Sequence, residues 1–366
     1  MNNNKYLSKQ YSLLNKEVRS DDKITKIFRK IIKIPALQYI LFGILMCVVG
    51  VLATKKILPY SWQSSFATTF AFAIAAIGFC LLMGYSGLAS LGTGGFIGIG
   101  TYAVHYVMVE AQLPFFVALI AAIAISVLIG LIVGFISLRI EGIYLVILTL
   151  ALSEILRTLY AAIEPKLYLS AKNAVLFGRK WPTSRSLILV SIVLVVIMII
   201  TSNLINSPTG RAMLAMKNST AAAQAMGISL IKYRLMAFII CTAYASVSGV
   251  LLMMVVRSAD ATDPTGYYAL LTSLNILAAV IIGGYKSIWG AVFGTFVMYG
   301  MEVVVFSQFD FFAENPLIIT LVSGILVIIV AMYYPGGLAQ LLVEAKGKIK
   351  KLIKKIKEGI YGKDLG

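Results

Sequence analysis

The sequence predicts an all-α membrane protein, a polytopic bundle of about ten transmembrane helices, of which eight to ten cross fully. Two observations lead to this prediction. The 366 residues are 60% hydrophobic and only 13% charged, whereas soluble domains are roughly 45–50% apolar and 25% charged. The apolar residues also gather in runs of about 20, the length at which an α-helix crosses a hydrocarbon core of about 30 Å. Because only helices and closed barrels satisfy their own backbone in lipid, runs of this length indicate helices.

Hydropathy places the spans in separate apolar segments. They lie at about 37–53, 66–83, 94–109, 115–136, 143–163, 187–206, 235–256, 270–283, 288–306 and 317–334. The segments 94–109 and 270–283 are short and flanked by glycine, so they fit broken or re-entrant helices as well as full crossings. The chain then divides into a basic N-terminal segment at 1–36, a transmembrane domain at 37–335 and a lysine-rich tail at 336–366.

Lys and Arg residues set the predicted orientation, because positively charged loops stay in the cytoplasm. With both termini in the cytoplasm, most of the 32 basic residues lie on the inner side. The loop 164–186 runs against this pattern, since it is basic and falls on the outer side, so its side stays open. The net charge of +17 is explained by basic flanks beside membrane lipid, and no nucleic-acid partner is expected. The tail could lie on an anionic leaflet as an amphipathic helix or form a solvated anchor.

The sequence lacks the motifs of an enzyme. It has no HExxH, CxxC, P-loop or GxSxG motif. Its 3 cysteines lie apart inside apolar spans, as packing residues do, so no metal, cofactor or disulfide is predicted. The lone histidine, His105, fits a hydrogen-bonded packing residue better than a proton relay. Catalysis is therefore not expected, and the energy that drives the protein must come from elsewhere.

Two charged residues, Glu154 and Arg157, lie inside a predicted span. They are three residues apart on one helix, close enough to pair. Charges within a bilayer usually face a partner or a cavity. A structural ion pair in the bundle interior and a role near a solute path both remain open.

Two glycine-rich segments, 84–104 and 281–296, interrupt the apolar pattern. Their glycines at the expected breaks are Gly87, Gly92, Gly283, Gly284 and Gly290. Discontinuous helices place backbone groups beside a transported solute, whereas small residues also serve ordinary helix packing; both interpretations stay open. The polar side chains that a solute could use in the first segment are Tyr85, Ser86, Ser90 and Thr93.

A polar, alanine-rich segment at 207–234 separates two of the apolar spans. It begins with SPTGR, continues with good helix formers and has a stop at Gly227, so it predicts a helix–turn–helix hairpin on the cytoplasmic face. Its Met and Ala side chains suit docking on a partner, whereas a mere linker would be polar and rich in Gly and Ser.

Four motifs occur in order between about residues 66 and 335. They read GLASLGTGGFIGIGTYA, RIEGIYLVILTLALSEIL, GRAMLAMKNSTAAAQAMGISLIKYRLMAF and IIGGYKSIWGAVFGTF. All four resemble motifs of the branched-chain amino acid permease family of ABC importers, and the third is similar to the cytoplasmic coupling loop of that family.

This resemblance implies a non-catalytic, multi-pass permease of the bacterial cytoplasmic membrane, whose expected cargo is branched-chain amino acids. The implied partners are cytoplasmic ABC ATPase subunits, a second permease in a heterodimer or homodimer, and an extracytoplasmic solute-binding protein. The residues expected to dock the ATPase are Gly210, Arg211, Ala215, Ala222, Ala223 and Gly227. Import of urea, amides, sugars or nucleosides by the same architecture, a secondary transporter coupled to ions and a structural scaffold stay open as alternatives.

Overall fold

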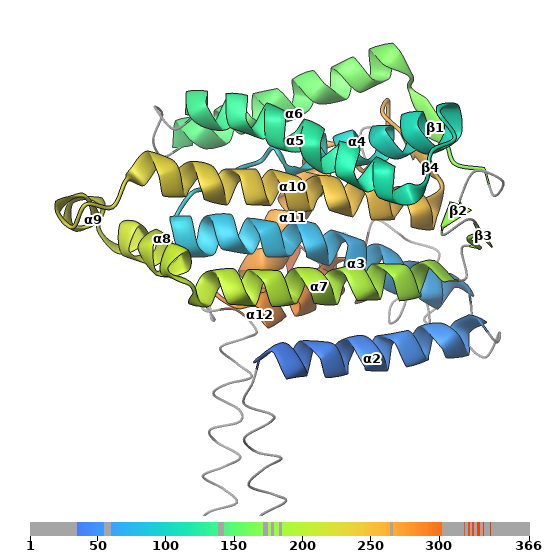
Figure 1. Cartoon of the computed structure of the whole chain (residues 1–366), viewed down its shortest axis with the longest axis horizontal. Helices are drawn as coiled ribbons and strands as arrows, with labels where there is room; N and C mark the ends of the chain where they lie inside the picture. Colours follow the sequence, from blue (N-terminus) through green and yellow to red (C-terminus); the bar gives the residue numbers. More distant parts are fainter. Residues whose placement is uncertain are drawn as a thin grey trace, which may run out of the picture.

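The computed structural model is a bundle of helices stacked roughly side by side (Figure 1). It describes residues 35–54, 60–137, 143–170, 175–176, 179–182, 185–263, 266–301 and isolated positions between 318 and 337. Nearly all of the predicted N-terminal segment, most of the last predicted span and nearly all of the lysine-rich tail lie outside these residues.

Helices make up nearly all of the described chain. In chain order the helices are α2 (Pro35–Thr54), α3 (Tyr60–Leu81), α4 (Thr93–Val104), α5 (Phe115–Ser137), α6 (Ile143–Ile163), α7 (Ser186–Asn206), α8 (Pro208–Asn218), α9 (Thr220–Ala225), α10 (Leu230–Val256), α11 (Leu270–Gly283) and α12 (Ile288–Thr295). Three π-helical turns extend α3, α4 and α12, namely η1 (Leu82–Ser86), η2 (His105–Glu110) and η4 (Phe296–Gly300). The strands form two antiparallel pairs: β1 (Lys166–Tyr168) with β4 (Ser258–Asp260), and β2 (Val175–Leu176) with β3 (Arg179–Lys180).

Every predicted span except the last coincides with a described helix, which confirms the polytopic helical class. Six described helices are long and apolar enough to cross a membrane: α2, α3 with η1, α5, α6, α7 and α10. The helix α11 has 14 residues, a length of about 21 Å at 1.5 Å per residue, which is short of a bilayer core. The segment 270–283 is thus too short to cross alone as a straight helix.

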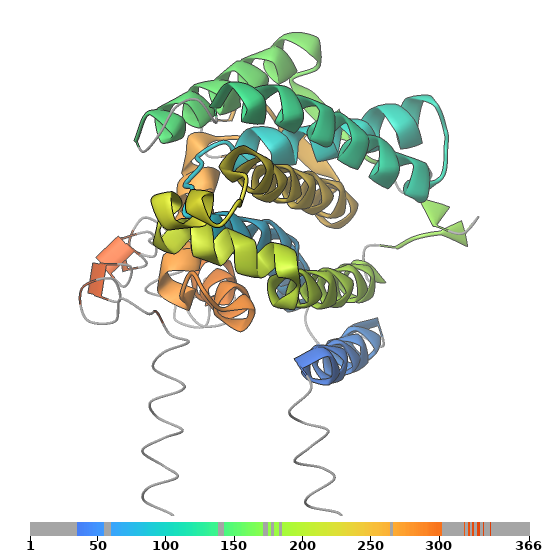
Figure 2. The same cartoon turned by 60° about the vertical axis from the view of Figure 1, so that its left-hand side comes forward.

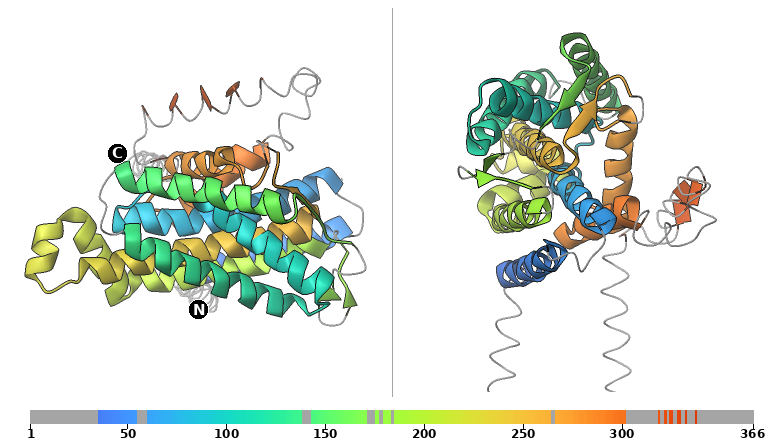
Figure 3. Two further views of the ribbon diagram at one scale, coloured as in Figure 1. Left: turned by 90° about the horizontal axis from the view of Figure 1, so that it is seen from above. Right: turned by 90° about the vertical axis from the view of Figure 1, so that its right-hand side faces the viewer.

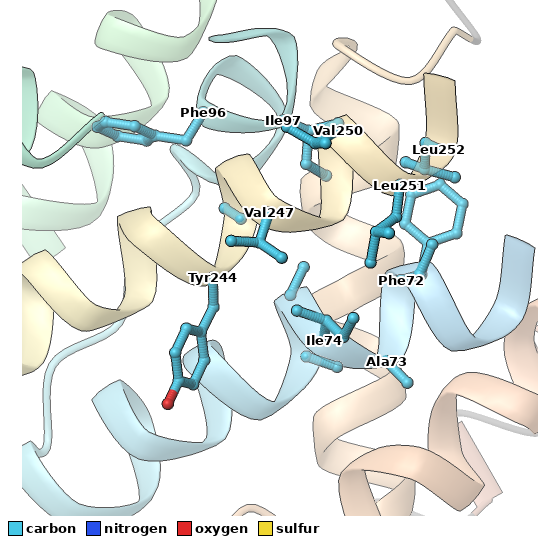
Figure 4. Close-up of a cluster of buried hydrophobic side chains, with 14 of the residues drawn as sticks. Phe72, Ala73, Ile74, Phe96, Ile97, Tyr244, Val247, Val250, Leu251 and Leu252 are labelled. Carbon is cyan, nitrogen blue, oxygen red and sulfur yellow. The ribbon is translucent and has the colours of Figure 1, made fainter. Parts of the chain in front are cut away.

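The core lies between α3 and α10. In the most apolar window of α3 and η1, 83% of the residues are buried, and in that of α10 72%, against 22% in α2, α5 and α6. Side chains from α3, α4 and α10 meet in one cluster, where Phe72, Ile97 and Leu251 are among the buried residues (Figure 4). The outer helices α2, α5 and α6 therefore offer the broad apolar faces that a bilayer would cover.

Glycine lets α4 and α10 approach closely. A Cβ atom on Gly249 of α10 would lie 1.9 Å from the Ile97 carbonyl oxygen, and one on Gly100 of α4 would lie 2.0 Å from the Ser246 carbonyl oxygen. Both contacts are with backbone atoms, which cannot rotate away. Small residues thus bring these two helices together, as they commonly do in membrane bundles.

The two ends of the bundle differ. The short helices α8 and α9 project at one end, while the strand pairs lie at the other (Figures 1 and 3). Seen from a second direction, α5 and α6 lie on one side of the α3–α10 core and α2 on the opposite side, next to α7 (Figure 2). The described part of the basic loop between α6 and α7, with β1, β2 and β3, therefore lies at the opposite end from the α8–α9 segment.

Candidate functional site

The segment between α7 and α10 folds as a hairpin of two short helices, α8 and α9. Ser207 caps α8, accepting a hydrogen bond from the Gly210 N–H at 3.4 Å, and Pro208 occupies the first turn. Ser219 has an extended backbone and caps α9 through the Ala222 N–H at 3.3 Å. The helical segment and its stop at Gly227, which has φ at +76°, are confirmed, while the sequence did not predict the further break at Ser219, which ends α8 and begins α9.

The six residues expected to dock an ATPase fall into two groups. Those exposed on the hairpin are Arg211, Ala215, Ala222 and Gly227. Gly210 and Ala223 are buried instead. A Cβ atom on Gly210 would lie 2.2 Å from the Ile205 carbonyl oxygen, so this glycine allows the tight turn from α7 into α8. Met226, just after α9, is 81% exposed; it is not one of these six residues but belongs to the Met side chains expected to suit docking.

The first glycine-rich segment breaks the chain between η1 and α4, as predicted. Gly87 ends η1 with φ at +75°, a left-handed conformation that suits glycine. The chain then runs without helix to Thr93, and the Leu91 N–H donates to the Thr149 hydroxyl at 3.0 Å. Gly92 lies against the Thr149 carbonyl, where a Cβ atom would come within 3.2 Å of the oxygen.

Serines from other helices cap the start of α4. The Gly94 N–H donates to Ser273 of α11 at 2.8 Å, and the Gly95 N–H donates to Ser153 of α6 at 2.9 Å. Free N–H groups at a helix start need such acceptors. Sequence reasoning missed these partners and Thr149. The signal for them was a hydroxyl residue placed within an otherwise apolar span.

Of the polar side chains expected beside a solute, three are already engaged. The Tyr85 hydroxyl donates to the Lys286 carbonyl at 3.2 Å, and the Ser86 hydroxyl to the Leu82 carbonyl at 2.6 Å. The Ser90 hydroxyl accepts from the Gly92 N–H at 3.2 Å. The Thr93 hydroxyl is buried and has no hydrogen-bond partner among the described residues. It is therefore the member of this set that is available to a ligand or a water.

The second glycine-rich segment breaks the chain between α11 and α12. Gly284 has φ at +104° and ends α11, and Ser287 caps α12 through the Gly290 N–H at 3.0 Å. A Cβ atom on Gly283 would lie 1.8 Å from the Gly290 carbonyl oxygen, so the two helices touch here at their backbones. The predicted break at 281–296 is confirmed.

The two breaks lie against each other. The Cys80 thiol donates to the Tyr285 carbonyl at 3.1 Å. A Cβ atom on Gly84 would lie 1.9 Å from the same carbonyl oxygen. Residues about 200 positions apart in sequence thus bring the end of α3 onto the turn between α11 and α12.

The hairpin reaches these breaks through Lys217. Its ammonium donates to the carbonyls of Met83 and Gly84 at 3.0 and 2.9 Å and lies 4.5 Å from the centre of the Tyr285 ring. Partial burial, followed by the nearby charge of Lys286, lowers the pKa of Lys217 from its ordinary value.

Glu154 and Arg157 form the predicted ion pair on α6. The Arg157 Nε atom lies 2.9 Å from the Glu154 carboxylate, and the two side chains are 29% and 35% exposed. Arg157 also donates to the Ala261 carbonyl at 3.5 Å, beyond β4. Both side chains are half-buried in this single chain, so the pairing is confirmed, while its place in the bundle interior or beside a solute path stays a prediction.

His105 lies in a polar cluster at the strand end of the bundle. Its Nε2 atom is 3.1 Å from the Glu164 carboxylate and 4.0 Å from that of Glu110, and Tyr102 donates to the Glu164 carbonyl. These contacts confirm a hydrogen-bonded histidine. The ring nitrogen and the two carboxylates lie within 4.8 Å of one another, so the three together could hold a proton or a cation.

A pocket of about 350 Å³ opens at the β1–β4 pair, lined in part by Lys166, Asp260 and Asp263. Hydrogen bonds from Thr262, followed by the charge of Lys166, lower the pKa of Asp260 from its ordinary value.

Residues 63–331 match the family described as the permease component of branched-chain amino acid transport systems. Over 248 residues the chain is 30% identical to the high-affinity branched-chain amino acid transport system permease protein LivM of Salmonella typhimurium and to that of Escherichia coli. It is 27% identical over 207 residues to a probable permease protein LivH of Methanocaldococcus jannaschii. The LivM matches cover 60% of this chain and 57% of each relative, and the LivH match covers 56% and 57%.

The chain thus spans a little over half the length of the curated relatives it matches. The family match, by contrast, runs from the start of α3 to the last predicted span and includes the hairpin and both breaks. Together with six apolar helices of membrane-spanning length, it shows a multi-pass protein of the cytoplasmic membrane that belongs to the branched-chain amino acid transport permease family.

Proposed function

We propose that this chain is the non-catalytic membrane subunit of an ABC importer and that it carries a small polar solute, with branched-chain amino acids as the first candidates. The observation that carries the proposal is the exposed α8–α9 hairpin at one end of a transport permease. A short helical hairpin with exposed alanines and Met226 suits a groove on a soluble partner. That partner would be an ATPase, which supplies the energy.

In this proposal the hairpin and both termini lie in the cytoplasm. The opposite end, with the β1–β4 pair and the basic loop 164–186, then faces outward. The distribution of Lys and Arg over the whole chain supports this orientation, since the two terminal segments hold many of the 32 basic residues. A solute-binding protein would dock at the strand end.

The solute path would run beside the two helix breaks. Thr93 offers a free buried hydroxyl at the start of α4, where the helix dipole is positive and favours an anionic group such as a carboxylate. The Glu154–Arg157 pair would face either this path or a second permease subunit, because a half-exposed ion pair facing lipid is costly.

Copurification tests the proposal. The purified wild-type chain should bring with it a protein that hydrolyses ATP, and Ala222→Glu should remove that ATPase, because Ala222 is exposed on α9 and an added carboxylate needs water or a cation. Tyr168→Glu adds the same charge on exposed β1, at the opposite end, and is the matched control. An importer without any copurifying ATPase would refute the proposal.

Uptake measurements test the cargo and the energy source. Cells that express the complex should accumulate labelled leucine, isoleucine or valine, and this uptake should stop when the ATPase is inactivated. Uptake of urea or a sugar, and not of these amino acids, would leave the proposed ABC importer in place and change only its solute. Uptake that persists without the ATPase would indicate a secondary transporter coupled to ions.

A further inference from the structure

Lys217 connects the α8–α9 hairpin to the interior of the bundle. It lies in the last turn of α8, and its side chain leaves the hairpin and reaches the end of η1. There its ammonium donates two hydrogen bonds, to the carbonyls of Met83 and Gly84, at 3.0 and 2.9 Å. The methylene stem passes Gly87, where a Cβ atom would lie 3.2 Å from the Lys217 Cγ atom.

The two carbonyls belong to the end of a broken helix. The last carbonyls of a helix have no partner within it. Here the chain turns away at Gly87 and its N–H bonds to the Leu82 carbonyl, which leaves the Met83 and Gly84 carbonyls to the ammonium of Lys217. A cation at this end also opposes the negative pole of the helix dipole. Lys217 therefore stabilises the position at which α3 and η1 stop.

The same ammonium contacts the second break. It lies 4.5 Å from the centre of the Tyr285 ring, within the range of a cation–π interaction. Tyr285 lies in the turn between α11 and α12, and its carbonyl accepts from Cys80 of α3 at 3.1 Å. One side chain from the hairpin thus binds to both breaks at the place where the two breaks touch.

Two other basic side chains of this region, Arg211 on α8 and Lys232 on α10, make local contacts instead. Arg211 donates to the Asn206 carbonyl, five residues away at 3.1 Å. Lys232 lies 5.9 Å from the ring of its neighbour Tyr233. A contact with one element would be enough if Lys217 only held the hairpin on the bundle. Instead its ammonium, which comes from α8, contacts both η1 and the α11–α12 turn.

We propose that Lys217 is a positioning residue that transmits movement of the α8–α9 hairpin to both helix breaks at once. This inference rests on the proposed function, in which an ATPase moves the hairpin. A displacement of α8 would change the two charged hydrogen bonds and the ring contact together. The segments 87–92 and 284–287 are the parts of the described chain that can change angle there, because they lack a continuous helical hydrogen-bond ladder.

The test measures coupling in the reconstituted complex of permease, ATPase and binding protein. Lys217→Met keeps an unbranched side chain as far as the Cε atom and removes the ammonium, and with it the donors and the charge. We expect this variant to retain assembly and ATP hydrolysis but to move at least about tenfold less solute per ATP, because loss of even one of the two charged hydrogen bonds corresponds to about that factor. Lys217→Arg, which can still donate and stack on the ring, should restore part of the ratio. Lys232→Met is the matched control and should keep the wild-type ratio.

A second variant avoids the hairpin. Tyr285→Leu removes the ring from the other side of the contact, so it should lower the ratio of solute to ATP without weakening ATPase binding. The double variant Lys217→Met with Tyr285→Leu should be no worse than Lys217→Met alone, because both changes break one connection. If Lys217→Met fails to assemble, the ratio of solute to ATP in Tyr285→Leu tests the proposal: a lowered ratio supports it, and a wild-type ratio overturns it.

The failures are distinguishable. If the wild type binds no ATPase, the proposed function falls. If the wild-type complex hydrolyses ATP and transports, but both Lys217→Met and Tyr285→Leu keep its ratio of solute to ATP, the inference about Lys217 alone is overturned.

Discussion

The contact between Gly283 and Gly290 gives a sharp test of the second helix break. The change is Gly290→Ala. The added Cβ atom would lie 2.3 Å from the Gly283 carbonyl oxygen and 2.8 Å from the Gly283 carbonyl carbon. Non-bonded heavy atoms prefer separations of about 3.5–4.0 Å. Because both contacted atoms belong to the backbone, no side-chain rotation can relieve the overlap, and α11 and α12 must move apart.

The expected cost follows from two opposing effects. Overpacking of a tight core costs typically about 1–3 kcal/mol, and a backbone neighbour places this site at the upper end. Alanine in place of glycine within a helix returns about 1 kcal/mol through its higher helix propensity. The net loss is therefore about 2 kcal/mol, or about thirtyfold in the ratio of folded to unfolded protein.

Unfolding of the purified protein in mixed detergent micelles, followed by circular dichroism, measures this loss. Gly324→Ala is the matched control, since Gly324 is helical and no described atom lies within 4 Å of a Cβ placed there. The control should be neutral or more stable by up to about 1 kcal/mol. Wild-type stability in Gly290→Ala would mean that α11 and α12 do not touch at this point.

Three further predictions concern the hairpin, the ion pair and the outer strands. Met226→Cys places a thiol at an exposed position, whereas the native Cys80 and Cys241 are buried and Cys47 is partly buried. The new thiol should react with an impermeant maleimide in inside-out vesicles, and reaction in intact cells would refute a cytoplasmic hairpin. Arg157→Leu should lower stability by about 1–3 kcal/mol, because it leaves Glu154 unpaired. This range is already reduced for the partial exposure of the pair. Replacing both residues by Leu should recover most of the loss, and equal losses in the single and double variants would argue against a coupled pair. The lowered pKa of Asp260 means that its ionised form stabilises the fold above the pKa of the unfolded chain. Protection of β1 and β4 from hydrogen exchange, measured relative to the unfolded chain at each pH, should therefore fall as the pH drops from about 4 through the lower folded pKa. Asp260→Asn should abolish this pH dependence, and a wild-type response in the variant would assign it to another group.

The positions of the long spans could be predicted from hydropathy, and some of their ends almost to the residue. The segment predicted at 187–206 is α7 at Ser186–Asn206. This works because lipid offers no hydrogen bonds, so an apolar run of this length must be helical. The start of α3 was missed, because Tyr60 to Ser65 are mostly polar and hydropathy treats such residues as loop. In the structure Gln63 is only 4% exposed, so burial within the protein accounts for a polar residue there.

The candidate site could be predicted only in part. Glycine marks both breaks, since a left-handed turn or a backbone contact requires it, and Gly284 and Gly87 occupy such turns. The groups that cap α4 could not be foreseen, because Ser153 and Ser273 come from α6 and α11 and no spacing in the sequence brings them together. For the small residues of the hairpin, the sequence could not predict which are exposed and which are buried. Ala222 and Ala223 are adjacent and alike, yet one is exposed and the other is 4% exposed, because successive helical positions face different directions.

The break at Ser219 bears directly on how a hairpin could transmit force. A single long helix would move its whole length as a rigid rod, whereas α8 and α9 are separate bodies joined at one extended residue. The exposed residues Ala222 and Met226 lie on α9 or just after it, and Lys217 lies on α8, which packs against η1. A partner that grips α9 would thus act on the breaks through the Ser219 joint. Lengthening that joint by one glycine should therefore uncouple transport while leaving the docking surface intact, and a variant that still transports at the wild-type ratio of solute to ATP would show that force enters by another route.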